Sequence, residues 1–283
     1  MYPDSLMPIQ GTSLSTSSQG ARPWRVAVLV AAALMLAALF VLPRMNSTAP
    51  TYRYSACVCP AYSASYSIVT LCRIGRAADA VDVADSALSN VPADSYEAAN
   101  LYFLRGGALR LLGRYSEAKA DYAEAADIAA PYVSPDSRME LLAQSGDVST
   151  LSELAQQSLS DNADNPYAVN NACWELAIYT DGSAAKAAQL MKPVAENSNN
   201  GAWIDTYAWT LYLSGDQQGA VQQEERAIQN IQSEDADHIA YYHACLEGME
   251  GNRAEAAQDL QQIFQDNIMF TSAWAAANQF AVR

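Results

Sequence analysis

The chain has 283 residues, and 51% of them are hydrophobic, so it is long and apolar enough to form one large domain or two small ones. Its 31 acidic residues outnumber the 16 basic ones, and this excess of negative charge repels nucleic-acid phosphates, which excludes nucleic acid as a partner. The same charge is compatible with a basic protein partner, and it also has a simpler interpretation as a source of solubility.

The N-terminal part of the chain predicts a polar tail followed by a membrane anchor. Residues 1–23 are rich in serine, threonine and glutamine, which is typical of a disordered tail. A run of 17 apolar residues, Val26–Leu42, follows. With Trp24 as an interfacial anchor, residues 24–43 just reach across a bilayer core of about 30 Å, so we expect a transmembrane helix. A cleaved signal peptide is the alternative, but the tail is long and no clean Ala-x-Ala site follows.

The arginines around the apolar run are balanced. Arg22 and Arg25 precede the run, and Arg44 and Arg53 follow it. A short tail with two arginines before the run, and an acidic region after it, favours the tail inside and the acidic region outside. We therefore expect a single-pass membrane protein whose main domain is extracytoplasmic, with residues 44–60 as the linker.

Six glycines recur after the linker at intervals of 33 to 38 residues. They are Gly75, Gly113, Gly146, Gly182, Gly215 and Gly251. The residue five positions after each glycine is alanine in five of the six cases, and the residue twelve positions after it is small or aliphatic. A glycine past the end of a helix supplies a left-handed cap that reverses the chain, and small residues let two helices approach to about 8 Å. The pattern predicts stacked antiparallel helical hairpins, since a single hairpin cannot bury its own apolar face.

These offsets resemble the tetratricopeptide repeat, which has a period of about 34 residues. The best-matching stretch is 99–132, with Gly106, Gly113, Tyr115, Ala118, Tyr122 and Ala125 in register. The segment 132–165 matches weakly, and in 166–200 the turn is longer and Cys173 replaces Glu175 as the small residue. The resemblance implies an all-α solenoid of about six hairpins over residues 61–270. A capping helix at 271–283 would place Trp274 and Phe280 against the last repeat.

The cysteines form no zinc ligand set. Cys57 and Cys59 are too close in sequence for a structural metal clip without further ligands nearby, and a bridge from Cys72 to either one stays an open alternative. Cys173 and Cys245 lie on predicted helices and are expected to be small core residues.

No other catalytic or cofactor motif stands out. His238 and His243 are five residues apart, which is not the spacing of a helical zinc pair, and His243 falls at a position expected to face the core. Motifs for a serine nucleophile or a phosphate-binding loop are missing. We therefore expect no enzyme activity, no cofactor and no metal.

The resemblance also implies a binding surface, because the first helix of each tetratricopeptide repeat lines a concave groove. The side chains that would face it are Asn170, Trp174, Asp205, Trp209, Tyr212, His238 and Tyr241. Trp174 and Trp209 hold equivalent positions in adjacent repeats and would form a rigid aromatic surface for an extended peptide or a helix. Packing of both tryptophans between repeats, as core, is the alternative.

The sequence thus predicts a membrane-anchored, non-enzymatic scaffold that binds a protein or peptide in the groove. The alternative is a self-associating structural component of an envelope complex that has no groove ligand. Partner identity and oligomeric state stay open at this point.

Overall fold

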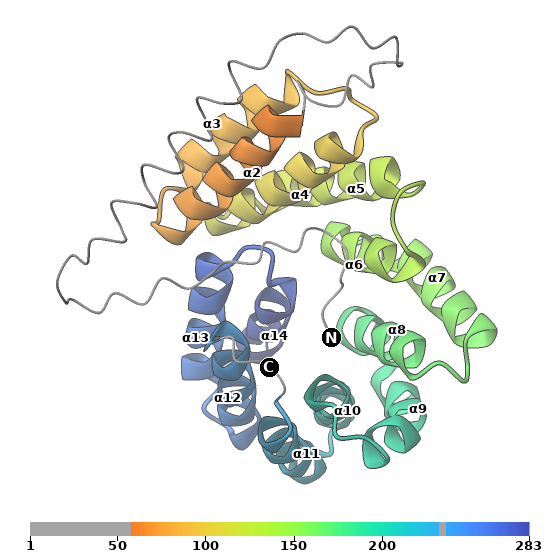
Figure 1. Ribbon diagram of the computed structural model, residues 1–283. Helices are drawn as coiled ribbons and strands as arrows, with labels where there is room; N and C mark the ends of the chain where they lie inside the picture. The colour runs from red at the N-terminus through yellow and green to blue at the C-terminus, as the bar shows by residue number, and fades with distance from the viewer. Residues whose placement is uncertain (1–57, 232–235, 283) are drawn as a thin grey trace, which may run out of the picture. The chain divides into compact units, whose positions relative to one another are not determined.

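The structure is a computed structural model that describes residues 58–231 and 236–282, all within one compact unit (Figure 1). The predicted tail (1–23), the predicted transmembrane helix (24–43) and the linker up to residue 57 lie outside the described residues. None of the described helices is long and apolar enough to cross a membrane.

The described residues form thirteen helices and no strand, as the all-helical prediction requires. Twelve helices pair into six hairpins: α2 (Val58–Arg73) with α3 (Ala77–Leu88), α4 (Tyr96–Leu111) with α5 (Tyr115–Ala129), α6 (Pro135–Ser145) with α7 (Val148–Asp161), α8 (Pro166–Tyr179) with α9 (Ala184–Glu196), α10 (Gly201–Ser214) with α11 (Gln217–Gln229), and α12 (Ala236–Glu250) with α13 (Arg253–Asp266). A last helix, α14 (Thr271–Val282), has no hairpin partner. Helix α2 starts inside the predicted linker because Pro60 lies in its first turn, where the missing N–H of proline is tolerated.

All six glycines of the repeat adopt the predicted left-handed conformation, with φ between 72° and 122°. Gly215 shows why. Its φ of 97° ends α10, its N–H donates to the Tyr212 carbonyl at 3.1 Å, and the next N–H, of Asp216, donates to the Leu211 carbonyl at 2.9 Å. The Asp216 side chain then accepts the Gly219 N–H at 2.9 Å and starts α11. One residue in the left-handed region therefore completes the turn.

The small residues of the repeat lie where the hairpins touch. Ala80, Ala118, Ala220 and Ala256, each five positions after a cap glycine, are fully buried. On α4, a side chain at Gly106 would lie 3.0 Å from the Tyr122 ring, which is itself fully buried. The predicted reason for the small residues, close approach of two helices, is thus confirmed.

The two helices of a hairpin differ in how they are buried. On α11, burial follows one stripe of Ala220, Glu224 and Ala227, so the rest of the helix faces solvent. On α8, every residue between Ala168 and Ile178 except Asn171 is buried, so this helix is covered on all sides. The first helices of the hairpins therefore form an inner layer, and the second helices form an outer layer.

The last hairpin returns to the first. Helix α13 lies beside α2, and the Arg73 Nε donates to the Asp266 carbonyl at 3.0 Å (Figure 1). The loop before α14 places Ile268 against Gly107 of α4. A β-carbon added at Gly107 would lie 3.1 Å from the Ile268 side chain. The last hairpin therefore contacts the first two hairpins directly.

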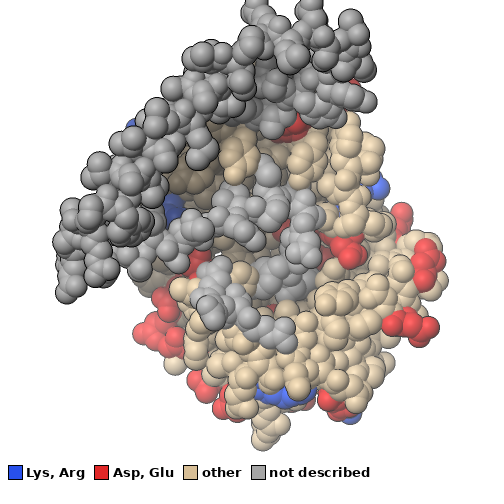
Figure 2. Space-filling view, viewed as in Figure 1, with Lys and Arg blue, Asp and Glu red and all other residues tan. Residues whose placement is uncertain are grey.

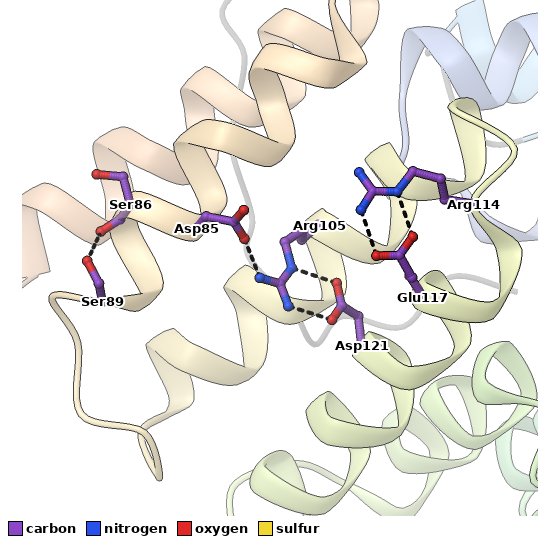
Figure 3. Close-up of polar contacts among 7 residues, drawn as sticks. All are labelled: Asp85, Ser86, Ser89, Arg105, Arg114, Glu117 and Asp121. Atoms are coloured by element: carbon purple, nitrogen blue, oxygen red, sulfur yellow. Dashed lines mark hydrogen bonds and ion pairs between the residues drawn. The ribbon is translucent and has the colours of Figure 1, made fainter.

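An ion-pair network ties three consecutive helices near the N-terminal end of the solenoid (Figure 3). Arg105 on α4 donates two hydrogen bonds to Asp121 on α5, at 2.7 and 2.8 Å, and pairs with Asp85 on α3. The Asp121 side chain is only 8% exposed, so this two-pronged pair is shielded from solvent and is more than a surface contact. The neighbouring pair of Arg114 and Glu117 lies within one exposed turn and contributes little to the free energy of unfolding.

The burial of His243 differs from the prediction, whereas that of Cys173 and Cys245 agrees with it. His243 was expected to face the core, but it is exposed, because the buried face of α12 runs through Tyr241, Ala244 and Cys245 instead. Cys72 is a free thiol in the core, and burial raises its pKa to about 12. The other two buried cysteines, Cys173 and Cys245, are core residues as predicted.

We predict that Gly215→Ala lowers the free energy of unfolding by about 1–2 kcal/mol. No atom lies within 4 Å of the added methyl group, so the cost comes from the left-handed backbone alone. Chemical denaturation measures the change, and Gln218→Ala, at an exposed site in the next turn, serves as the control with a change below about 0.5 kcal/mol. An equal effect of both substitutions would contradict the strained-cap explanation.

Candidate functional site

Helix α14 lies against the inner layer of the solenoid (Figure 1). Its contacts reach six helices besides the adjacent α13, including α5, where Tyr115 lies 5.9 Å from Trp274 between ring centroids. Arg110 of α4 lies over the Trp274 ring, Thr271 donates to Glu140 of α6, Gln279 donates to the Ile178 carbonyl of α8, and Phe280 packs on Trp209 of α10 and on Gly248 of α12. Trp274 also packs on Phe264 of the last hairpin, as predicted for a capping helix, at 5.3 Å between ring centroids. Phe280 also contacts the last hairpin, at Gly248, and in addition reaches Trp209 of α10.

The structure brings together three of the residues predicted to line the groove. The rings of Trp174 and Trp209 meet edge to face with centroids 6.2 Å apart, and Tyr212 lies 5.8 Å from Trp209. Phe280 covers this cluster, with its ring 5.0 Å from Trp209 and 5.6 Å from Tyr212. All three predicted residues are at most 5% exposed, so in this structure they are core, the alternative that the sequence left open.

The other predicted groove residues divide into two places. His238 and Tyr241 pack around Phe270, each about 5 Å from it between ring centroids. Asn170 is buried and donates to the Asn171 side chain at 3.2 Å, and Asp205 is buried near α11. Six of the seven predicted groove residues are thus buried and His238 is half-buried, because α14 and the loop before it lie against the inner face; their role in binding stays a prediction.

A small acidic pocket remains on the inner face, between α6, α8 and the start of α14. Its lining residues are Asp136, Glu140, Gln144, Asn171, Trp174, Glu175, Tyr179, Thr271 and Ser272. The remaining space is about 20 Å³, enough for one water-sized group. Three carboxyl groups surround this space, and Trp174 provides its aromatic wall.

The pocket carboxyl groups differ in their partners. Glu140 accepts a hydrogen bond of 2.6 Å from the Thr271 hydroxyl, and Asp136 accepts one of 2.9 Å from Asn171. Glu175 has one buried oxygen that accepts no hydrogen bond from the described residues. Burial raises the pKa of Glu140 to about 6, and burial together with the charges of Glu140 and Asp136 raises the pKa of Glu175 well above its usual value. The pocket would therefore be stabilised by a positively charged group.

A buried arginine borders the pocket on the α4 side. Arg110 is 8% exposed, and its guanidinium lies 4.4 Å from the Tyr122 ring centroid and 5.3 Å from that of Trp274. It donates to the side chain and to the backbone carbonyl of Gln144, at 2.6 and 3.1 Å. Arg110 thus donates to Gln144, and among the described residues it forms no ion pair with the pocket carboxyl groups.

Sequence reasoning missed the buried acids, although a signal was present. Glu175 was noted only as out of register, and Glu224 stands nine positions after Gly215, where Tyr122, Met191 and Leu260 stand in other repeats. An acid at a position that is otherwise apolar indicates a buried carboxyl group. Thr271 and Ser272 carried no such signal, because their contact with α6 depends on the closure of the solenoid.

On the face that Figure 2 shows, acidic side chains do not gather into one patch. There they are spread over several helices, and basic side chains are few. The acidic pocket therefore differs from the outer surface in the burial of its carboxyl groups and not in charge alone.

No protein-family model matches the chain, and no curated protein is significantly similar to it. Among solved structures, the chain is similar to a tetratricopeptide repeat protein from Parabacteroides merdae, with 15% identity over 79% of this chain and 86% of that one, at a TM-score of 0.40. An assembly chaperone of RpL4 (Acl4) matches at 15% identity over 79% and 96%, also at 0.40. The TPR2AB domain of yeast Sti1, solved with an HSP90 peptide, matches at 12% over 78% and 97%, at 0.28. At such TM-scores these similarities establish no shared fold, so the hairpin architecture rests on the helices and glycine caps of this chain.

We predict that Gly248→Ala loosens α14. The added methyl carbon would lie 2.4 Å from the Phe280 ring, so the ring must move out of its place beside Trp209, at a cost of about 1–3 kcal/mol. Hydrogen exchange of the backbone amides of 271–282 should become about tenfold faster or more. His243→Ala, at an exposed position of the same helix, is the control. Unchanged exchange in α14 would contradict its attachment through Phe280.

We predict that Glu140→Gln stabilises the protein at pH 8 by about 2 kcal/mol and has little effect at pH 4.5. The folded pKa of about 6 lies above the unfolded value of 4.5, so the folded state holds a proton that the unfolded state has lost. The contribution of Glu140 to the free energy of unfolding is therefore fully present below pH 4.5 and is lost as the pH rises through about 6. Denaturation at both pH values measures this, with the exposed Glu153→Gln as control. An effect of equal size at both pH values would show that ionisation of Glu140 is not the cause.

Proposed function

We propose that this chain is a membrane-anchored, non-enzymatic scaffold that binds a protein or peptide at the inner face of its helical-hairpin unit. The observation that carries the proposal is the acidic pocket between α6, α8 and α14, where three carboxyl groups and Trp174 surround an unfilled water-sized space. Membrane anchoring and an extracytoplasmic domain rest on the apolar run Val26–Leu42 and on the arginines around it.

The pocket favours a partner that presents a lysine side chain. An ammonium group is compact and has three donors, which matches a small space bordered by carboxylate oxygens. One Glu175 oxygen is available to accept such a donor, because no described residue uses it. The Trp174 ring in the pocket wall would contact the aliphatic part of the lysine.

A second candidate function, self-association without a groove ligand, is favoured by the N-terminal hairpin. Tyr62 and Tyr66 on α2 are 50% and 60% exposed and lie one helical turn apart on the same helix. An open groove of about 700 Å³ lies between α2 and α3, with Ala61, Ala64 and Val83 in its wall. A second chain packing on this end would bury both features.

Site-specific photo-crosslinking in cells producing the full chain tests the proposal. A photoreactive phenylalanine analogue at Ser272, beside the pocket, should form an adduct with another protein, whereas the same analogue at Gln156, exposed on α7, should not. Glu175→Gln should reduce the Ser272 adduct at least about fivefold, because it removes a carboxylate from the pocket.

Two results would contradict binding at the inner face. Equal adduct yields from Ser272 and Gln156 would show that the pocket has no special role. Adducts of twice the mass of the chain, together with a concentration-dependent dimer in light scattering, would support self-association instead.

A further inference from the structure

A second group of buried acids lies outside the pocket, where three consecutive helices meet. Asp205 of α10, Glu224 of α11 and Cys245 of α12 are 3%, 0% and 0% exposed. One carboxylate oxygen from each acid and the Cys245 Sγ lie within 4.8 Å of one another. The three residues are 19 and 21 positions apart, so the hairpin stacking brings them together and no short motif reveals them.

Glu224 stands at a position where the other repeats bury apolar side chains. The equivalent residues, nine positions after each cap glycine, are Ala84, Tyr122, Ala155, Met191 and Leu260, and all five are fully buried. A glutamate in this place forgoes the stabilisation that an apolar side chain supplies and adds the cost of removing a carboxylate from water. This cost requires a compensating partner.

No basic side chain among the described residues provides such a partner. Neither oxygen of Glu224 accepts a hydrogen bond of good geometry, and neither does Oδ1 of Asp205. Among the described side chains, no lysine, arginine or histidine forms an ion pair with either acid. One oxygen of Glu224 lies within the cluster, so two carboxyl groups and a thiol meet at one buried point.

We propose that Asp205, Glu224 and Cys245 form a structural zinc site that ties α10, α11 and α12 together. A thiolate with carboxylates suits zinc, whereas magnesium and calcium require more oxygen ligands. Each of the three side chains supplies one donor atom, and a water molecule would complete a four-coordinate site. In a tetrahedral site neighbouring ligand atoms are about 3.5 Å apart, and small side-chain rotations close the present separations to that value. Binding would release the protons held by the thiol and by the carboxyl pair to solvent.

The test uses the full chain without a histidine tag, purified in detergent and free of chelator. The zinc content should be about one ion per chain by mass spectrometry of the metal. After removal of zinc with a chelator, the melting temperature should fall, and addition of zinc should restore it. Cobalt(II) added to the metal-free chain should produce a thiolate-to-cobalt charge-transfer absorption.

Two variants and one control make the test specific. Glu224→Leu introduces leucine, the residue that the last hairpin carries at the equivalent position (Leu260), so the variant should fold. It should hold less than about 0.1 zinc ion per chain, and a chelator should not change its melting temperature. Cys245→Ser should lose the cobalt absorption and bind zinc at least about a hundredfold more weakly. Cys173→Ser, which removes a buried cysteine outside the cluster, should retain both the zinc and the cobalt absorption.

Two results would overturn the site. The first is a wild-type chain without zinc, without the cobalt absorption and with a melting temperature that neither zinc nor chelator alters; the acids then share a proton instead of a metal. The second is equal zinc content in the wild type and in Glu224→Leu, which would place the metal elsewhere. Neither result bears on partner binding at the acidic pocket, which does not include these residues.

Discussion

The packing of α14 against the inner layer is the interaction on which the rest of the solenoid depends. Phe280 reaches α10 and α12, and Trp274 lies between α4 and α13, so one short helix contacts both ends of the repeat array. Gly248 permits this approach because it leaves room for the Phe280 ring. As a result a side chain such as Trp209, which would line a groove in an open solenoid, is core here.

Closure of the solenoid has an electrostatic consequence. It removes carboxyl groups from water at two places, Glu140 with Glu175 on the inner face and Asp205 with Glu224 between α10 and α11. Burial of unpaired carboxylates is costly, so each place favours a cation. The first borders a pocket on the inner face, whereas the second is enclosed between α10, α11 and α12. Chemically similar residues therefore differ in whether they border an open space.

The hairpins were predictable because their signals are local. A cap glycine such as Gly215 requires only its own backbone conformation, and Ala220 requires only the neighbouring helix of its hairpin. The groove prediction used the same register and correctly placed Trp174 beside Trp209, yet it could not foresee Phe280 above them. His243 was misplaced because the buried stripe of α12 follows the contacts made by Tyr241 and Ala244. Glu224, by contrast, breaks the apolar pattern at its repeat position, so its burial could have been predicted from the sequence although it was missed.

The sequence by itself determined the helical hairpins, their number and the positions where they turn, because these depend on interactions between residues close in the chain. The apolar run near the N-terminus and the acidic charge are likewise properties of the sequence alone. Only the tertiary structure decided which side chains are accessible. The contact between Thr271 and Glu140 joins residues 131 positions apart, and that between Gln279 and Ile178 joins residues 101 apart. Such contacts depend on the summed rotation of successive hairpins, which no local pattern of residues specifies.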